Sequence, residues 1–475
     1  MHSPYKYILM NRIRQTAKYV IVDFSVAAIV WLILNIIRYH EVAQYEGFTR
    51  LSSFLLFHQV LKGEILIPIF WAILYYFSGY YNRPFGKSRI NELFNTFVTA
   101  SIGVVFVFFV VVLDDLPDSF QIYYIIFFSY FFMQFFVTYL CRFLITNHAL
   151  RKVKRREWLT NALVIGTGQK AAKFSDELMK LGYRITGFVA DGRQTVQAVS
   201  DHELLGDLAD LPRLITDYHV DELIVIPDSI SDEDTIHLLY SLYHYKMPVK
   251  IRLEKSNPLL RAEVKTIHGI PLIEVTTNNF SDAGKNIKNA VDKFASALAL
   301  ILLSPLFLYI AIRVKLTSKG PVFFRQERIG YRGRPFTIYK FRTMVVDSDK
   351  QGPLLTERDD PRVTPFGRFL RKYRLDEFPQ FWNVLIGDMS IVGPRPEQRY
   401  YIDQIVKKAP YFYLLHNVRP GITSWGMVKY GYAETVDKMI ERLNYDIMYY
   451  ENMSLTLDIT ILLYTIQTVF TGKGI

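Results

Sequence analysis

The stretch FASALALILLSPLFLYIAIRV occupies residues 294–314, and it decides how the rest of the chain is arranged. It is long enough to cross a bilayer, because about 20 apolar residues span a hydrocarbon core roughly 30 Å thick. Lysines and arginines flank it on both sides, which favours placing both ends on the cytoplasmic face. Ser304 and Pro305 lie in its middle, where a proline bends a helix. These features predict a re-entrant helix over residues 289–316, with a kinked crossing helix as the alternative.

The two alternatives place the remainder of the chain on opposite sides of the membrane. Re-entry would leave residues 316–475 on the cytoplasmic side, whereas a crossing helix would export them. We expect the Ser304 hydroxyl to support the bend by donating a hydrogen bond to the Leu300 carbonyl. The apolar run at 455–470 is interrupted by Asp458, and we expect it to lie at the membrane interface.

Residues 1–150 carry four further apolar stretches that are long enough to span a membrane. They lie near residues 18–38, 60–80, 93–113 and 120–146. Three of the flanking segments are basic, and the loop between the third and fourth stretches is acidic, with Asp114, Asp115 and Asp118. The sequence therefore predicts a four-helix transmembrane bundle with both ends on the cytoplasmic side. Asp23, within the first stretch and about one turn from Lys18, is expected to anchor the helix at the interface, with a functional intramembrane carboxylate as the alternative.

Composition excludes several classes of protein. Half of the 475 residues are hydrophobic, which excludes a disordered or collagen-like chain. The single cysteine, Cys141, excludes an intramolecular disulfide and a cysteine-rich metal site. The net charge of +11 suits cytoplasmic loops, an anionic bilayer surface or phosphate ligands. No basic stripe with interleaved aromatic residues is present, so we expect no nucleic-acid partner.

Residues 151–278 read as a Rossmann-like α/β domain with a parallel, doubly wound sheet. Strands are predicted at 162–165, 185–190, 222–226 and 248–252, with a helix at 169–181. Gly166 and Gly168 begin a G-x-G-x-x-A pattern between the first strand and that helix, and Asp191 follows the next strand. This pattern is typical of a loop that binds NAD or another nucleotide. The alternative is a tight turn that needs glycine without any ligand.

Two adjacent carboxylates, Asp376 and Glu377, lie in the most basic part of the chain. We expect the surrounding cations to hold both carboxylates ionised. An ionised carboxylate can ligate Mg²⁺ together with substrate phosphates, or attack phosphorus as a covalent nucleophile. The alternative is a surface pair engaged in salt bridges.

Five ordered blocks between residue 288 and the C-terminus resemble the monotopic phosphoglycosyl transferases, the bacterial sugar transferase family. The blocks are LSPL at 303–306, YKFRTM at 339–344, LDEFPQFWN at 375–383, GDMSIVGPRPE at 387–397 and VRPGIT at 418–423. Together with the four N-terminal stretches and the α/β domain, they make the whole chain look like the large form of this family. Its members include the undecaprenyl-phosphate glucose and galactose phosphotransferases.

The resemblance implies that residues 279–475 form an α/β monotopic catalytic domain. Asp376 would attack the sugar-linked phosphate of a UDP-hexose carrying glucose or galactose, and UMP would leave. Undecaprenyl phosphate would then take the hexose 1-phosphate from Asp376. The product would begin synthesis of an exopolysaccharide, capsule or O-antigen. Mg²⁺ would be held partly by Asp376, and Glu377 would position the metal or act as an acid or base.

The resemblance also assigns roles to basic residues and to the chain as a whole. Arg371 would bind the polyprenyl phosphate, Arg395 and Arg419 would lie on the nucleotide-sugar side, and Lys340 is a weaker candidate for phosphate contact. Ser304 and Pro305 match the family's re-entrant break. The family implies a homodimer in the bacterial inner membrane, with its catalytic domain on the cytoplasmic face. Departures from the usual family pattern are small, namely Tyr373 and Arg374 in place of small hydroxyl residues and Phe378 in place of leucine.

Two other functions remain open at this point. One is a membrane-tethered, NAD-dependent nucleotide-sugar epimerase or dehydratase that uses the α/β domain. The domain lacks a Tyr-x-x-x-Lys pair, since His244 follows Tyr240 and Met247 follows Tyr243 at that spacing, and this speaks against such an enzyme. The other is a non-enzymatic scaffold for polysaccharide export.

Overall fold

The structure is a computed structural model, and its chain divides into two compact units that are described separately. The first unit contains Met1–Thr160, Leu178–Arg184 and Ser281–Asn286, and the second contains the remainder. The described residues are 4–43, 47–82, 84, 89–112, 119–154, 159–180, 183–191, 199, 203–226, 238–239, 241–242, 245, 247–252, 264–267, 270–274, 278, 280–317, 319–345 and 360–471.

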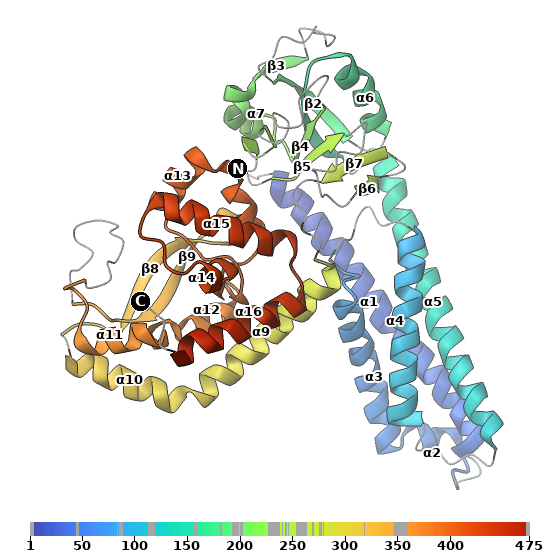
Figure 1. Ribbon diagram of the computed structural model, residues 1–475. Coiled ribbons are helices and arrows are strands. Elements are labelled where there is room, and N and C mark those ends of the chain that lie inside the picture. The colour runs from blue at the N-terminus through green and yellow to red at the C-terminus, as the bar shows by residue number, and fades with distance from the viewer. Residues whose placement is uncertain are drawn as a thin grey trace. The chain divides into compact units, whose positions relative to one another are not determined.

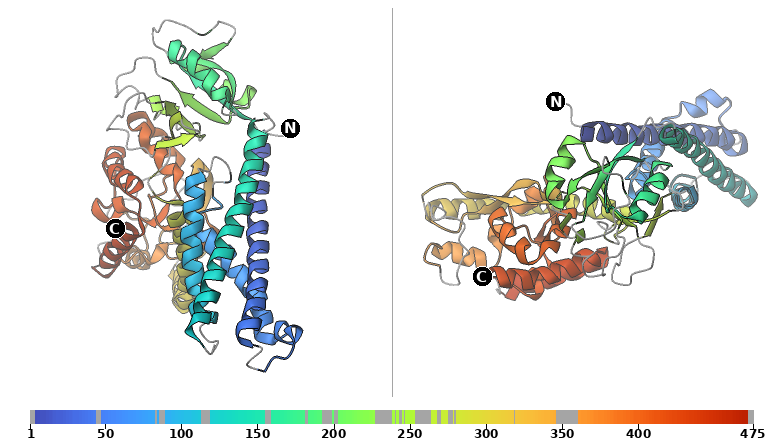
Figure 2. Two further views of the ribbon diagram at one scale, coloured as in Figure 1. Left: turned by 90° about the vertical axis from the view of Figure 1, so that its right-hand side faces the viewer. Right: turned by 90° about the horizontal axis from the view of Figure 1, so that it is seen from above.

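The N-terminal part is a bundle of long helices, as the sequence predicts. The helices are α1 (Pro4–Arg38), the short α2 (Leu51–Leu55), α3 (His58–Phe77), α4 (Arg89–Val107) and α5 (Phe120–Lys154). Of these, α1, α3, α4 and α5 lie side by side in both orientations shown (Figures 1 and 2). Among the described residues, four helices are long and apolar enough to cross a membrane, which confirms the predicted number. The acidic residues Asp114, Asp115 and Asp118 lie outside the described residues.

Asp23 is buried between helices of the bundle, and its predicted place at the membrane interface stays a prediction. Its carboxylate is buried and pairs with Arg142 of α5, with Nε–Oδ1 and Nη2–Oδ2 distances of 2.9 and 2.7 Å. The Tyr81 hydroxyl donates a third hydrogen bond to Oδ2 at 2.9 Å. Sequence spacing indicates Lys18 as a basic neighbour of Asp23. Arg142 lies 119 positions away, and only the packing of the helices brings it next to Asp23. The pair fixes α1 against α5, because separating it would leave a buried charge without a partner.

The α/β domain contains a seven-stranded sheet with the order β3-β2-β1-β4-β5-β7-β6. Its elements are β1 (Thr160–Ile165), α6 (Gln169–Lys180), β2 (Tyr183–Ala190), β3 (Leu204–Asp207), α7 (Leu211–Asp217), β4 (Glu222–Val225), β5 (Val249–Arg252), β6 (Val264–Ile267) and β7 (Ile270–Glu274). The pairs β2–β3, β1–β4 and β4–β5 are parallel, which confirms the parallel sheet. The antiparallel hairpin β6–β7 at the end of the sheet was not predicted.

Gly166 has a structural reason to be glycine. Its φ is +130°, and its amide donates to the Val189 carbonyl at 2.9 Å. A Cβ atom there would lie 2.3 Å from the carbonyl oxygen of Ile226, so no larger residue fits. Gly168 lies in the same turn before α6, and Asp191 directly follows β2. The tight-turn alternative therefore explains Gly166 without a ligand, and nucleotide binding by this loop stays a prediction.

The decisive hydrophobic stretch forms two helices that meet at Ser304. Helix α9 (Asp282–Leu302) and helix α10 (Ser304–Thr317) are bent by 62° relative to each other. The Ser304 hydroxyl donates to the Ile301 carbonyl at 2.8 Å, so the expected bond to Leu300 is wrong by one residue. The reason is that Pro305 has no amide hydrogen to offer the Ile301 carbonyl, and the hydroxyl supplies the missing donor. The bend lies where the sequence predicts it.

The C-terminal domain is a mixed arrangement of short elements around several hydrophobic clusters. It contains β8 (Phe323–Ile329), β9 (Pro335–Phe341), α11 (Pro365–Lys372), α12 (Gln380–Ile386), β10 (Ser390–Val392), α13 (Arg399–Lys408), β11 (Gly421–Thr423), α14 (Trp425–Lys429), α15 (Val436–Glu451) and α16 (Leu455–Thr471). Strands β8 and β9 form an antiparallel hairpin, and β10 pairs with β11 in parallel. One of these clusters includes Ile402, Leu443, Tyr449 and Ile461.

A buried polar cluster ties helix α9 to the rest of this domain. Lys288 of α9 contacts Asp458 of α16 at 2.7 Å and Asp292 of its own helix at 3.5 Å. Asp292 in turn accepts a hydrogen bond from Ser390, the first residue of β10. Asp458 therefore faces the interior and does not simply interrupt the apolar run of α16. These contacts fix the apolar helix α9 to β10, the strand that precedes Arg395.

Candidate active site

The two adjacent carboxylates lie on a single turn of 3₁₀ helix, η6 (Leu375–Glu377), just after α11. Helix α11 begins at a Thr364 cap, whose hydroxyl accepts the Gly367 amide at 3.0 Å. Gly367 packs so closely on the chain after β9 that a Cβ atom would lie 2.1 Å from the Thr343 carbonyl oxygen. On the other side of η6, the buried Asn383 of α12 donates to the Thr337 carbonyl of β9 at 2.7 Å. Both contacts hold the carboxylate turn against β9.

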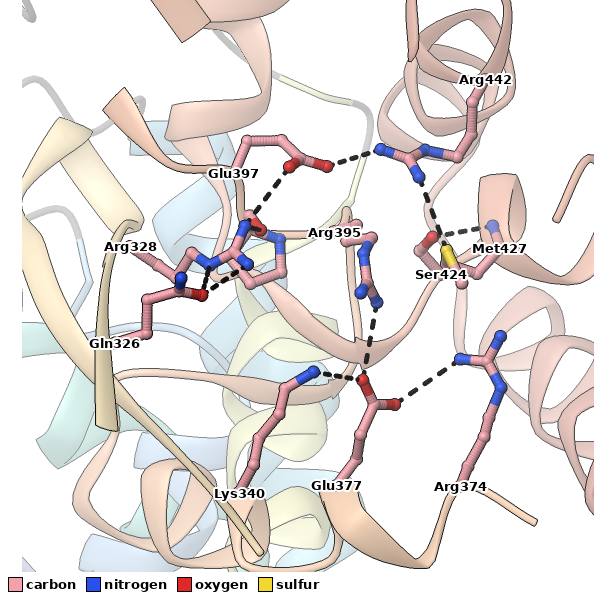
Figure 3. Close-up of polar contacts among 11 residues, drawn as sticks. Gln326, Arg328, Lys340, Arg374, Glu377, Arg395, Glu397, Ser424, Met427 and Arg442 are labelled. Carbon is pink, nitrogen blue, oxygen red and sulfur yellow. Dashed lines mark hydrogen bonds and ion pairs between the residues drawn. The ribbon is translucent and has the colours of Figure 1, made fainter. Parts of the chain in front are cut away.

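Glu377 is the centre of a cluster of three cations (Figure 3). The Nζ atom of Lys340, from β9, lies 2.8 Å from Oε1 of Glu377. One Arg395 nitrogen lies 3.8 Å from the same oxygen, and one Arg374 nitrogen lies 3.5 Å from Oε2. Glu377 itself is only 8% exposed. This carboxylate is therefore engaged by the protein, and its role is to hold three positive charges at one place.

The electrostatic environment shifts the pKa values of the two carboxyl groups in opposite directions. Burial acts to raise the pKa of Glu377, but Lys340, Arg395 and Arg374 outweigh it and hold that pKa well below its ordinary value. Burial and the adjacent charge of Glu377 raise the pKa of Asp376, against the opposing effect of the nearby cations. The expectation that cations keep the pKa low is confirmed for Glu377. For Asp376 the pKa is raised instead, because burial and the charge of Glu377 outweigh the nearby cations.

Asp376 is as buried as Glu377, yet its carboxylate makes no hydrogen bond or ion pair with any residue that the structure describes. Its nearest electrostatic influences include Lys340, Arg371 and Arg374. A carboxylate in this state keeps its lone pairs available for an incoming group. The pair thus consists of Glu377, which is bound to cations, and Asp376, whose oxygens are accessible to an incoming group; an accessible carboxylate can act as a nucleophile.

The other predicted basic residues are placed differently. Arg371 of α11 donates to the Thr343 hydroxyl at 2.9 Å, and its charge acts on Asp376. Arg419 instead donates to Asn289 of α9, and no contact joins it to the carboxylate pair among the described residues. The structure therefore brings together Asp376, Glu377, Lys340 and Arg395, with Arg371 nearby. The residues after the break at 304–305, Leu306 and Phe307, pack in the same hydrophobic cluster as Leu375 of η6, whereas the loop at 166–168 belongs to the α/β domain.

A second ion network supports the loop that carries Arg395 (Figure 3). Glu397 is 5% exposed and accepts from Arg442 of α15 at 2.5 Å and from Arg328 of β8 at 3.4 Å. Arg328 also donates to the Pro396 carbonyl at 3.3 Å. Sequence reasoning missed this network and also the contact of Arg374 with Glu377. The sequence Pro394-Arg395-Pro396-Glu397 indicates a loop. The residues that bind Glu397 lie on other elements, so the sequence alone does not reveal them.

The residues around Asp376 fit a magnesium ion only if Asp376 is its single protein ligand. Among the described residues, no group of three or more His, Cys, Asp or Glu side chains converges on a metal position. Glu377 is occupied by cations, while the carboxylate of Asp376 is available. Mg²⁺ commonly takes one or two carboxylates and completes its shell with water and substrate phosphates. Asp376 as a single protein ligand is compatible with that pattern.

Comparison with protein families gives two matches. Residues 283–472, which include all of the site, match the family described as bacterial sugar transferase. Residues 76–253, which include most of the α/β sheet, match a family described as CoA-binding domain. The first match covers the five sequence blocks that surround the carboxylate pair.

Three curated relatives are similar to this chain. The UDP-N-acetylgalactosamine-undecaprenyl-phosphate N-acetylgalactosaminephosphotransferase of Aeromonas hydrophila is 46% identical over 188 residues, 40% of this chain and 44% of the relative. The UDP-glucose:undecaprenyl-phosphate glucose-1-phosphate transferase of Xanthomonas campestris pv. campestris is 35% identical over 334 residues, 66% of each chain. The protein of the same name from Caulobacter vibrioides is 41% identical over 186 residues, 39% of this chain and 70% of the relative. The chain thus spans less than half the length of the first of these relatives.

Proposed function

The chain belongs to the bacterial sugar transferase family, and on that premise we propose that it transfers a sugar 1-phosphate from a UDP-sugar to undecaprenyl phosphate. One observation supports this most strongly. Asp376, a buried carboxylate that has no hydrogen-bond or ion-pair partner among the described residues, adjoins a carboxylate that holds three cations. This arrangement offers a nucleophile and a concentration of positive charge at the same place, and a sugar diphosphate needs both.

The proposed reaction has two displacements. An Asp376 oxygen attacks the phosphorus next to the sugar, the bond from that phosphorus to the bridging oxygen breaks, and UMP leaves with the electron pair. An undecaprenyl phosphate oxygen then attacks the same phosphorus, and the bond to Asp376 breaks. The products are UMP and an undecaprenyl-diphospho-sugar, and the Asp376 carboxylate is regenerated. No net proton transfer is required in either displacement.

The surrounding side chains would stabilise the charge that moves during both displacements. Lys340 and Arg395, held by Glu377, would face the negatively charged phosphate oxygens of the bound donor. We propose that Arg371 binds the lipid phosphate and that Arg419 serves the nucleotide end. Mg²⁺, if held by Asp376, would supply further neutralisation of the diphosphate.

The position of the site relative to the membrane follows from the bent helix pair. We propose that α9 and α10 enter and leave one leaflet, so that the catalytic domain stays on the cytoplasmic face of the inner membrane. The 62° bend and the basic residues at both ends of the pair support this. Asp376 would then meet a water-soluble and a lipid substrate at one boundary. We also propose a homodimer, and a product that begins synthesis of an exopolysaccharide, capsule or O-antigen.

The experiment that tests this function is UMP release by the full chain in detergent or liposomes with undecaprenyl phosphate. The donor panel is UDP-glucose, UDP-galactose, UDP-N-acetylglucosamine and UDP-N-acetylgalactosamine. We expect turnover with at least one donor, UDP-glucose first, and no sustained turnover when the lipid phosphate is omitted. UDP-N-acetylgalactosamine is included because a relative is named for that sugar. Absence of UMP release with every donor would reject the transferase proposal and favour a scaffold.

A further inference from the structure

Arg374 adopts a backbone conformation that its side chain disfavours. Its φ and ψ are 52° and 25°, in the left-handed region. It directly follows Tyr373, the C-cap of α11, which is a position that glycine commonly fills because it has no Cβ atom. The local fold would therefore accept glycine more readily than arginine. An arginine at such a position suggests that its side chain serves a purpose other than ending the helix.

The side chain of Arg374 is half-buried, and its guanidinium makes few hydrogen bonds with the described residues. Its side chain is 19% exposed, and its Nε is buried without a hydrogen-bond acceptor among the described residues. The nitrogen that faces Glu377 lies 3.5 Å from Oε2, longer than the roughly 2.7–2.9 Å of a charge-assisted hydrogen bond. Lys340, by contrast, contacts Glu377 at 2.8 Å. Arg374 therefore has hydrogen-bond donors that no residue described in the structure accepts.

The charges at this place do not balance within the protein. Glu377 carries one negative charge, and Lys340, Arg374 and Arg395 all approach it. Adding Asp376 still leaves an excess of positive charge, and the charge of Arg371 also acts on Asp376. Buried charges are expensive unless they are paired, so the cluster is suited to an additional anion. Two phosphate oxygens match the fork of an arginine.

We propose that Arg374 binds the phosphoryl group that is being transferred at Asp376. The proposal rests on the proposed function, because that function supplies the phosphoryl group. Arg374 lies two positions before Asp376 on the same turn, so the guanidinium can contact the phosphoryl group both in the donor and on the aspartate. It thus acts in both displacements, unlike a residue that binds only the lipid phosphate or only the nucleotide.

The test compares Arg374→Gly with Arg374→Lys and with the control Arg332→Gly. Glycine keeps the left-handed backbone, so we expect an unchanged or higher melting temperature. We expect kcat to fall on the order of 10²-fold, with a smaller change in KM for the UDP-sugar. Arg374→Lys should recover part of the rate, because it restores the charge without the fork. Arg332 has a φ of 57° on an exposed turn of the same domain, and its replacement should leave kcat unchanged.

Four outcomes separate this inference from its alternatives. Normal kinetics of Arg374→Gly would overturn it. A fall in melting temperature that accompanies the loss of rate, repeated in Arg374→Asn, would also overturn it by showing that the side chain holds the fold. Lack of UMP release by the unmodified protein with every donor would instead reject the proposed function. Slowing of only one displacement in single-turnover measurements would contradict the claim that Arg374 acts in both.

Discussion

Replacement of Asp376 by asparagine is expected to reduce sugar-phosphate transfer by roughly 10⁴-fold or more, as loss of a covalent nucleophile does in other enzymes. Asparagine has nearly the same volume, and Asp376 makes no hydrogen bond or ion pair with another described residue, so the fold should be retained. A neutral amide, however, is a poor nucleophile toward phosphorus. The measurement is UMP release from the best UDP-sugar with undecaprenyl phosphate, together with the melting temperature.

A matched control for this variant is Asp437→Asn. Asp437 is an exposed carboxylate that pairs with Lys408 on the surface of the same domain, and such pairs contribute little. Its variant should keep full activity. Normal turnover by freshly prepared Asp376→Asn, with deamidation excluded by mass spectrometry, would contradict the covalent route.

Replacement of Glu377 by glutamine is expected to lower kcat/KM by about 10²-fold and to move its acid limb to lower pH. The rate falls because Lys340, Arg374 and Arg395 lose the charge that places them, and small displacements of positioning groups carry penalties of this size. The pH shift follows from Asp376, whose pKa is raised by burial and by the charge of Glu377. Removing that charge lowers the pKa of Asp376, so the nucleophile stays ionised to a lower pH.

The measurement is the pH profile of kcat/KM for the UDP-sugar, which reports ionisation in the free enzyme. Glu434→Gln is the control, because Glu434 forms only an exposed pair with Lys438. An acid limb that stays fixed or moves to higher pH in Glu377→Gln would show that the charge of Glu377 does not raise the pKa of Asp376.

The fold was most predictable where one physical signal dominates. The four long helices follow from apolar length, and the bend at Ser304 and Pro305 follows from the missing amide of proline. Strands β1, β2, β4 and β5 follow from short apolar runs between helical segments, whereas β3 was not predicted. The hairpin β6–β7 was also missed, because Lys265 and Pro271 interrupt its two short strands and weaken the strand pattern.

Local sequence patterns do not predict contacts between residues that are far apart in the chain. Lys18 is the only basic neighbour of Asp23 that spacing suggests, whereas the real partner, Arg142, lies on another helix. The same reason explains why Arg442 was not connected with Glu397. Such pairs depend on the packing of whole elements, which a single sequence does not specify residue by residue.

The sequence predicted most members of the candidate site but not the different contacts that its two carboxylates make. Sequence motifs identified Asp376, Glu377, Lys340 and Arg395, and the structure places all four together. Only the geometry distinguishes the carboxylate that holds cations from the one that is available. Arg374 looked like a minor departure in sequence because neither its left-handed backbone nor its contact with Glu377 is visible there.

If Asp376 carries the sugar phosphate covalently, the adduct can be trapped on the protein. The full chain is incubated without lipid phosphate and with a UDP-sugar radiolabelled in the phosphate next to the sugar. We predict protein-bound label equal to the UMP released, located on the peptide containing Asp376, absent from Asp376→Asn and discharged by undecaprenyl phosphate. UMP release that requires the lipid phosphate from the first turnover, with no label on the protein, would contradict the account.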